Sequence, residues 1–135
     1  MTDFFVFDTN NLVSAVLFEN STTAKALDAA FEQGNLVVSN ETMNELANVL
    51  FRKKFDSYLS DEERWQFIDR IESKSKVIFP NVQITDCRDP KDNKFLELAV
   101  TAKASCIVTG DKNLLILHPF RNIPIMNASN FLKQF

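Results

Sequence analysis

The chain has 135 residues, a size typical of one domain, and its composition (45% hydrophobic, 24% charged) is that of an ordinary globular protein. A net charge of −3 argues against a general electrostatic binder of nucleic acid but allows a local basic rim. No apolar run approaches the roughly 20 residues of a membrane span, and no secretory leader is expected. The two cysteines, Cys87 and Cys106, lack a C-x-x-C spacing, which favours a reducing cytoplasm over a disulfide scaffold.

The first half of the chain alternates short apolar strands with helices. Residues 4–7 form an unbroken apolar run, which predicts a central parallel strand covered on both faces. Gly34 is typical of the residue just past a helix end. The basic cluster at 52–54 suits the end of the third helix, with phosphate binding as the alternative. The remaining predicted elements of this half are helices at 11–18, 23–33 and about 40–51, and a strand at 36–38.

The second half continues the alternation. Ser60 and Glu63 form a capping box that predicts a helix to about residue 73, with Trp65 facing inward. A third strand, at 77–79, stops at Pro80. The remaining predicted elements are a helix at 95–103, a strand at 106–109, a short helix at 113–117, a strand at 123–126 and a final helix from 129. This order predicts a single domain over residues 1–135, with a parallel sheet between two layers of helices.

Acidic residues stand at the places where such sheets bind ligands. Asp8 follows the first strand and Asp111 follows the fourth, while Asp89 and Asp92 precede the helix that leads into the fourth. Glu45 lies beside the buried stripe of the helix after the second strand. If the first and fourth strands are neighbours, Asp8 and Asp111 meet across the crevice between them. The alternative for Asp8 is that it simply turns the chain.

Carboxylates that converge without a lysine or arginine repel one another, so we expect a divalent cation among them. Oxygen ligands favour Mg²⁺ or Mn²⁺ over zinc. Zinc is further disfavoured because the chain has a single histidine, His118, which we expect in a surface loop.

Four motifs in this order resemble the PIN-domain ribonucleases over nearly the whole chain. The resemblance is strongest to the branch of toxin components of toxin–antitoxin pairs. The motifs are FDTNNL at 7–12, TMNEL at 42–46, RDPKDNKFLELA at 88–99 and IVTGD at 107–111.

The resemblance implies a three-layer α/β/α fold with a five-stranded parallel sheet of order 3-2-1-4-5. It also implies cleavage of RNA that depends on Mg²⁺ or Mn²⁺. The catalytic and metal-binding acids correspond to Asp8, Glu45, Asp92 and Asp111, and the usual third acid falls close to Asn93, which is the alternative ligand beside Asp92. The supporting polar residues are Thr9, Asn10, Asp89, Asn93 and Thr109.

In this scheme Asp8, Asp92 and Asp111 hold one ion, and a second ion is bridged by Asp8 and held partly by Glu45. Basic residues near the site, among them Arg52, Lys53, Lys91 and Lys112, are candidates for positioning phosphates, with a solvated surface role as the alternative. The resemblance further implies a cognate antitoxin that docks near the crevice and a homodimer. An excess of phenylalanine, thirteen residues, predicts either a well-filled core or an apolar patch for a partner.

Other strand-end aspartate enzymes fit less well. An aspartyl-phosphate phosphatase needs a second acid where Asn10 stands, and a phospho-receiver domain needs an acidic pair near the amino terminus and a late lysine. Dinucleotide binding needs a glycine-rich loop, and the chain has only Gly34 and Gly110. The serious alternative is a non-catalytic PIN-like module that binds RNA or a protein.

Overall fold

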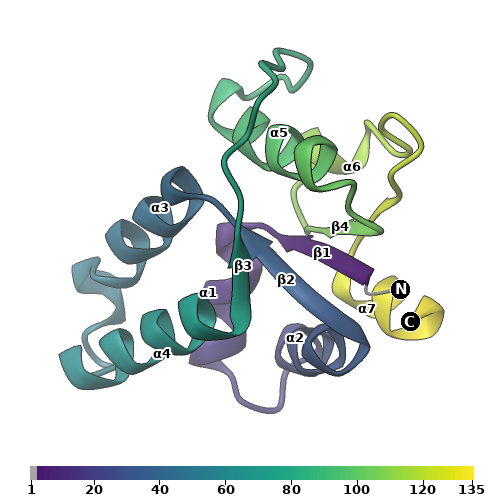
Figure 1. Ribbon diagram of the computed structural model, residues 1–135. Helices are drawn as coiled ribbons and strands as arrows, with labels where there is room; N and C mark the ends of the chain where they lie inside the picture. Colours follow the sequence, from purple (N-terminus) through teal and green to yellow (C-terminus); the bar gives the residue numbers. More distant parts are fainter. Residues whose placement is uncertain (1–2) are drawn as a thin grey trace.

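A computed structural model describes residues 3–135, which form one five-stranded parallel sheet. The strands lie in the order β3-β2-β1-β4-β5, which confirms the predicted order and puts β1 at the centre (Figure 1). The chain reverses its winding direction between β1 and β4, so the carboxyl ends of these two strands flank the crevice where open sheets bind ligands. The strands are β1 (Asp3–Phe7), β2 (Gly34–Val38), β3 (Ser75–Val77), β4 (Cys106–Val108) and β5 (Ile125–Met126).

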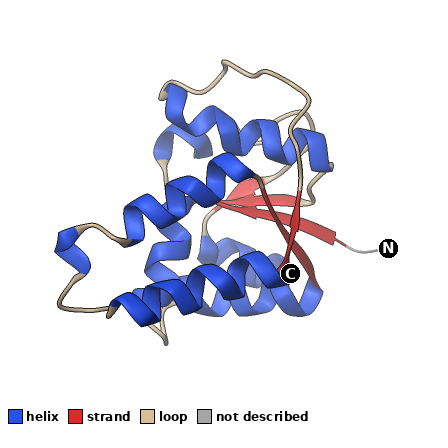
Figure 2. Cartoon of the chain, turned by 60° about the vertical axis from the view of Figure 1, so that its left-hand side comes forward, coloured by secondary structure: helices blue, strands red, loops and turns tan. Residues whose placement is uncertain are grey.

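Helices cover both faces of the sheet, which confirms the predicted three-layer architecture. Figure 1 shows α5 and α6 on one side, and α1, α2 and α7 on the other. Helices α3 and α4 pack as a pair that extends beyond the sheet (Figure 2). The helices are α1 (Thr9–Leu17), α2 (Thr22–Gln33), α3 (Asn40–Leu50), α4 (Asp61–Lys74), α5 (Asn93–Ala102), α6 (Lys112–Leu115) and α7 (Ala128–Gln134), with 3₁₀ turns at Lys53–Phe55 and Pro90–Asp92.

The central strand is buried from both sides, as its unbroken apolar run predicts. Phe5 and Phe7 belong to the core beneath α1, α2 and α7, whereas Val6 belongs to the core beneath α5. The ring of Phe5 packs edge-on against Phe131, with the ring centroids 5.1 Å apart. Burying one such side chain contributes about 1.5–3 kcal/mol. A strand without polar alternation is therefore stable only when both of its faces are covered.

The start of α4 is set by a local hydrogen-bond pattern that the sequence predicts. The Ser60 backbone N–H donates to the Glu63 carboxylate at 3.0 Å, and the Glu63 backbone N–H donates to the Ser60 hydroxyl at 3.1 Å. Ser39 and Thr42 form a second reciprocal box at the start of α3. These contacts satisfy backbone donors that a helix start leaves unpaired.

The prediction that Trp65 faces inward is wrong. Its side chain is 54% exposed and lies against Phe51, and the preceding residue, Arg64, takes the inward position. Arg64 is 3% exposed and donates to Asp56 at 2.8 Å and to Asp61 at 3.0 Å. Arg64 shares one face of α4 with the buried stripe further along the helix, because residues three, four and seven apart lie on the same side.

Three boundary predictions also need correction. Strand β3 begins at Ser75 and ends at Val77, where its partner β2 ends at Val38; Phe79, predicted as strand, is 74% exposed. Helix α3 ends at Leu50, so the basic cluster 52–54 follows the helix and forms part of a separate turn. The final strand is also shorter than predicted, because Ile123 pairs with Phe120 in a local bridge outside the sheet.

Gly34 ends α2 but does so with extended backbone, at φ −175°. It is also the first residue of β2 and pairs with Asp3 of β1. A Cβ atom at this position would lie 2.1 Å from the Asp3 carbonyl oxygen. The requirement for glycine therefore comes from the close approach of the two strands.

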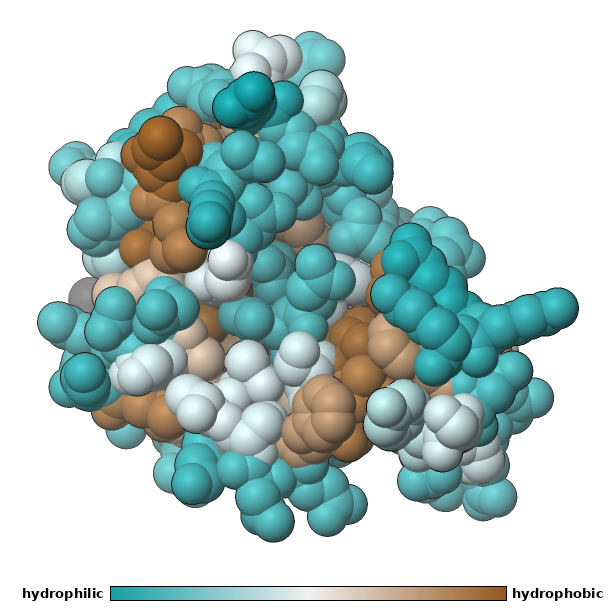
Figure 3. Space-filling model, turned by 180° about the vertical axis from the view of Figure 1, so that it is seen from behind, coloured by the Kyte–Doolittle hydropathy of each residue, from teal (hydrophilic) through white to brown (hydrophobic). Residues whose placement is uncertain are grey.

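Most of the phenylalanines are either buried in the core or partly buried and packed against it. Figure 3 shows apolar patches interrupting a largely hydrophilic surface on the back of the molecule. Phe18 is 52% exposed and contacts the exposed ring of Tyr58. The buried phenylalanines are Phe5, Phe7, Phe67, Phe95, Phe120 and Phe131.

Within residues 3–135, no helix has the length and apolar character needed to cross a membrane.

Candidate active site

A cleft of about 270 Å³ opens at the carboxyl ends of β1 and β4. Five acidic side chains line it, together with two basic ones. The sequence-predicted acids therefore lie on one cavity, at the crevice that the strand order predicts. The lining residues are Asp8, Thr9, Asn10, Glu45, Val49, Arg52, Asp89, Lys91, Asp92, Phe95 and Asp111.

Asp8 is held at the floor of the crevice by contacts on both carboxylate oxygens. One oxygen accepts from the backbone N–H of Asn11 at 2.8 Å, so Asp8 caps α1. The other accepts from the hydroxyl of Thr109, which is fully buried at the end of β4. Burial raises the pKa of Asp8, and the hydrogen bonds from Thr109 and Asn11 oppose that rise. Asp8 thus both turns the chain and presents a buried carboxylate to the cleft.

Asp111 is fixed in a similar way at the end of the neighbouring strand. Its carboxylate accepts from the Asn113 backbone N–H at 2.8 Å and caps the short helix α6. Its own backbone N–H donates to the Thr109 hydroxyl oxygen at 3.0 Å. Thr109 therefore contacts both acids, and it sets the Asp8 carboxylate and the Asp111 backbone relative to each other.

Asp92 stands just before α5 with one carboxylate oxygen buried. That oxygen, Oδ2, has no hydrogen-bond partner within residues 3–135. Burial raises the pKa of Asp92 to about 6. A side-chain hydrogen bond with Asp111 and the negative charges of Asp111 and Asp89 add to the rise, and the charge of Lys94 opposes it. An unpaired buried carboxylate oxygen is costly, so this atom is the one most in need of a positive ligand.

The two other polar residues of this loop have structural contacts. The side-chain oxygen of Asn93 accepts from the Cys87 backbone N–H at 2.8 Å, and Asn93 is not among the residues that line the cleft. Asp89 lines the cleft and caps the turn at Pro90–Asp92 by accepting from the Lys91 backbone N–H at 3.1 Å. Of the neighbouring pair Asp92 and Asn93, Asp92 is the one that faces the cleft.

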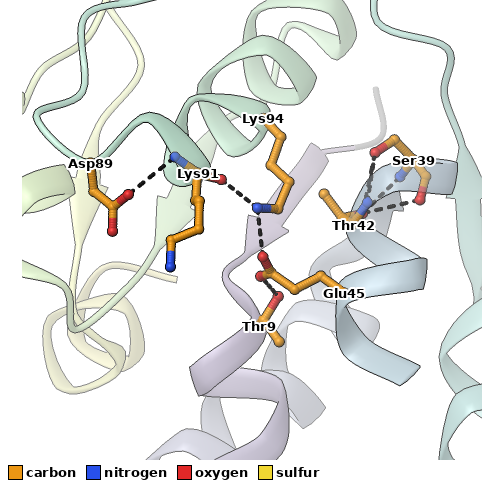
Figure 4. Close-up of polar contacts among 7 residues, drawn as sticks. All are labelled: Thr9, Ser39, Thr42, Glu45, Asp89, Lys91 and Lys94. Carbon is orange, nitrogen blue, oxygen red and sulfur yellow. Dashed lines mark hydrogen bonds and ion pairs between the residues drawn. The ribbon is translucent and has the colours of Figure 1, made fainter. Parts of the chain in front are cut away.

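The expectation that the acids gather without a cation is wrong, because Lys94 pairs with Glu45. The Lys94 ammonium lies 2.6 Å from Glu45 Oε2 (Figure 4). The residue Lys94 is 7% exposed. It also donates to the backbone carbonyl of Lys91, and the other Glu45 oxygen accepts from the Thr9 hydroxyl. Sequence reasoning missed Lys94. The signal that could have found it is its place in the first turn of α5, where a cation opposes the helix dipole and needs a partner.

The carboxylates that line the cleft suit a hard divalent cation, because their ligand atoms are all oxygens. One of these oxygens, on Asp92, is buried and unpaired within residues 3–135. Among the described residues 3–135, no three His, Cys, Asp or Glu side chains are grouped closely enough to hold a metal ion. Chelation by three of these carboxylates would therefore need their side chains to move closer together. His118 lies outside the cleft in an exposed loop, and its Nδ1 accepts from the Ile125 backbone N–H at 2.9 Å.

A family model described as PIN domain matches residues 5–113. The chain belongs to the PIN-domain family. A relative, the uncharacterized protein MJ1680 of Methanocaldococcus jannaschii, is 36% identical over 114 residues, which cover 83% of this chain and 73% of the relative.

Solved structures share the fold of this PIN domain at low sequence identity. VapBC2 from Rickettsia felis, bound to a DNA fragment from its promoter, matches with a TM-score of 0.62 and 15% identity over 92% of this chain and 98% of that one. PAE2754 from Pyrobaculum aerophilum matches with a TM-score of 0.62 and 15% identity, over 97% of this chain and 88% of that one. VapBC-1 from nontypeable Haemophilus influenzae matches with a TM-score of 0.59 and 15% identity, over 93% of this chain and 98% of that one. At this identity the likeness is one of fold.

Proposed function

We propose that this PIN domain is a ribonuclease that depends on Mg²⁺ or Mn²⁺. The observation that carries the proposal is the placing of Asp8, Asp92 and Asp111 on one cleft at the junction of β1 and β4, with a buried oxygen of Asp92 unpaired. Membership of the PIN-domain family supports nuclease activity. A cleft with this much negative charge favours a cation over a phosphate, so a metal ion is what allows RNA to approach.

The protein's own contribution is to hold its oxygen ligands in place. Thr109 holds the Asp8 carboxylate and the Asp111 backbone, and the caps on α1 and α6 fix the orientation of both side chains. Asp92 completes the set from the start of α5. The chemistry that a bound divalent ion supplies is Lewis-acid activation of water and stabilisation of charge on a phosphodiester.

Two cations on the cleft are suited to positioning the RNA backbone. Arg52 lies just past the end of α3 and Lys91 lies in the turn before α5, and both side chains line the cavity. Arginine and lysine bind phosphate oxygens by charge-assisted hydrogen bonds. Both residues are exposed, so each is free to move toward a bound strand.

The biological role we propose is that of the toxin in a type II toxin–antitoxin pair. Its support is the resemblance of the motifs around Asp8, Glu45, Asp92 and Asp111, together with a fold shared with VapBC2 and VapBC-1. In this role the protein would act on RNA in the cytoplasm, form a homodimer and be inhibited by a cognate antitoxin docked near the cleft.

Cleavage of a labelled single-stranded RNA by the purified protein tests the enzymatic proposal. We expect cleavage with Mg²⁺ or Mn²⁺, none with EDTA, and none by Asp8→Asn at any metal concentration. Asp69→Asn is the matched control, because Asp69 is an exposed acid on α4 away from the cleft. Equal cleavage by Asp8→Asn and the wild type would point to a contaminating nuclease and remove the support for this site.

A non-catalytic PIN-like module that binds RNA or a protein is the second candidate. It is favoured by the absence of a preformed three-acid cluster in residues 3–135 and by the neutralisation of Glu45 by Lys94. Calorimetry separates the two functions. A protein that binds neither Mg²⁺ nor Mn²⁺ and cleaves no RNA is a binding module, whereas metal binding that Asp8→Asn abolishes supports the nuclease.

The toxin role is tested through the neighbouring open reading frame. Expression of this protein alone should arrest growth, and co-expression of a small adjacent gene product should restore growth and copurify with it. The Asp8→Asn variant should leave growth unaffected while still copurifying. Unimpaired growth during expression of the wild type would argue against a toxin.

A further inference from the structure

Lys94 is an unusual residue to find at the edge of an acidic cleft. It is 7% exposed, although lysine is rarely buried without a strong partner. It also lies in the first turn of α5, where the helix dipole disfavours a positive charge. Both features cost stability, so the contacts of its ammonium group must offset them.

Three groups surround the Lys94 ammonium: the Glu45 carboxylate, the Lys91 carbonyl and the Phe95 ring. The ammonium pairs with Glu45 Oε2 at 2.6 Å, donates to the Lys91 carbonyl, and lies 5.2 Å from the centre of the Phe95 ring. Thr9 donates to the other oxygen of Glu45. Figure 4 shows Lys94 reaching from α5 across to Glu45 on α3, with Thr9 at the start of α1 beneath it. Both oxygens of Glu45 are therefore engaged by this chain's own donors.

We propose that Lys94 is a built-in counter-cation for Glu45, so that the cleft takes one divalent ion, on the side of Asp8, Asp92 and Asp111. This inference rests on the proposed function and makes it more specific. A divalent ion bound by Glu45 would lie next to an ammonium on the same carboxylate, and like charges at that range repel strongly. Displacing the ammonium would also mean moving the buried Lys94 side chain away from Glu45, the Lys91 carbonyl and the Phe95 ring.

In this arrangement Lys94 is a positioning residue. Its positive charge holds Glu45 against the wall of the cleft, and the Thr9 hydroxyl holds the other side of the same carboxylate. Glu45 then shapes the cleft without ligating the ion. Removing the charge of Lys94 should free Glu45 and open a second ion site beside it.

The number of Mn²⁺ ions bound by the metal-free protein at neutral pH, measured by equilibrium dialysis, tests this directly. We expect one ion per chain for the wild type and for Lys94→Arg, which keeps the charge. Lys94→Met, which keeps most of the side-chain length, should bind two. The double variant Lys94→Met with Glu45→Gln should bind one again, because the freed carboxylate is gone.

A single variant that keeps Lys94 gives a test that does not depend on how Lys94→Met folds. Glu45→Gln retains an oxygen for the ammonium and should still bind one ion. If Glu45 is a ligand of a second ion, the wild type binds two and Glu45→Gln binds one. Circular dichroism checks that each variant is folded.

The outcomes separate this inference from the proposed function. Two ions in the wild type, or one ion in folded Lys94→Met, overturns the role of Lys94 and leaves the metal-dependent nuclease standing. No ion in the wild type overturns both. One ion in the wild type and two in Lys94→Met supports both.

Discussion

The hydroxyl of Thr109 donates a hydrogen bond to the Asp8 carboxylate across the junction of β1 and β4. Its oxygen in turn accepts from the backbone N–H of Asp111 at 3.0 Å. One buried hydroxyl thus connects the two acids that end neighbouring strands. The geometry of the cleft depends on this contact as much as on the acids themselves.

Replacing Thr109 by valine should destabilise the protein by about 1–3 kcal/mol, because the Asp8 carboxylate and the Asp111 N–H each lose a buried partner. Valine has nearly the same shape, so packing changes little. Urea denaturation measures the loss. Thr109→Ser keeps the hydroxyl and should lose less than Thr109→Val. Equal stability of Thr109→Val and the wild type would mean that the contact contributes nothing.

The two glycines make a matched pair. Gly34→Ala should destabilise the protein by about 1–3 kcal/mol or more, since its Cβ would lie 2.1 Å from the Asp3 carbonyl oxygen and the strands must move apart. Gly110→Ala meets nothing within 4 Å and should change stability by no more than about 0.5 kcal/mol. Thermal unfolding of the two variants side by side decides the point, and similar losses in both would contradict it.

The metal-free protein should lose stability as the pH rises from about 4 to about 6. In the folded chain the pKa of Asp92 is raised from 3.8 to about 6, so the folded state holds this proton more tightly than the unfolded state. The free energy of unfolding falls with rising pH wherever the folded state binds more protons than the unfolded state. Melting temperatures in EDTA across this range measure the fall. Asp92→Asn should show a smaller fall than the wild type, and identical profiles would show that Asp92 titrates normally.

Saturating Mn²⁺ should raise the melting temperature of the wild type, because an ion that binds only the folded state stabilises it. At a concentration 100 times the dissociation constant the gain is about 2.7 kcal/mol. Asp8→Asn should show little or no rise, whereas Asp69→Asn should respond like the wild type. An equal rise in Asp8→Asn would place the ion elsewhere.

Substituting Arg52 or Lys91 by alanine should weaken binding of single-stranded RNA and flatten its salt dependence by about 0.7 in slope per lost phosphate contact. Fluorescence anisotropy at several salt concentrations, with Mg²⁺ present and a cleavage-resistant RNA analogue, gives both quantities. Lys133→Ala is the control, because Lys133 is an exposed cation on α7 and does not line the cleft. A loss of equal size in Lys133→Ala would point to a diffuse electrostatic effect.

The order of elements and the placing of the main acids could be predicted from local patterns. The unbroken apolar run before Asp8 predicts a doubly covered strand, and the Ser60–Glu63 box predicts the start of α4. Asp8 and Asp111 each follow a strand, so the parallel order alone brings them to one edge of the sheet. These patterns succeed because hydrophobic periodicity and capping act between residues that are close in the chain.

Other features were decided by packing between distant segments. Strand β3 ends where its partner β2 ends, and Arg64 rather than Trp65 is buried because of the way α4 lies on the core. Closer in the chain, the loop before α5 folds so that the Asn93 side-chain oxygen accepts from the Cys87 backbone N–H, and Asp92 is the residue that lines the cleft.

The amino-acid sequence by itself determined the family, the parallel sheet and the edge where the acids collect. The tertiary structure alone decided that Lys94 neutralises Glu45, because that pair forms only when α5 packs beside α3. A contact between segments far apart in the chain leaves no local periodicity, and its energy appears only once the two helices have been brought together.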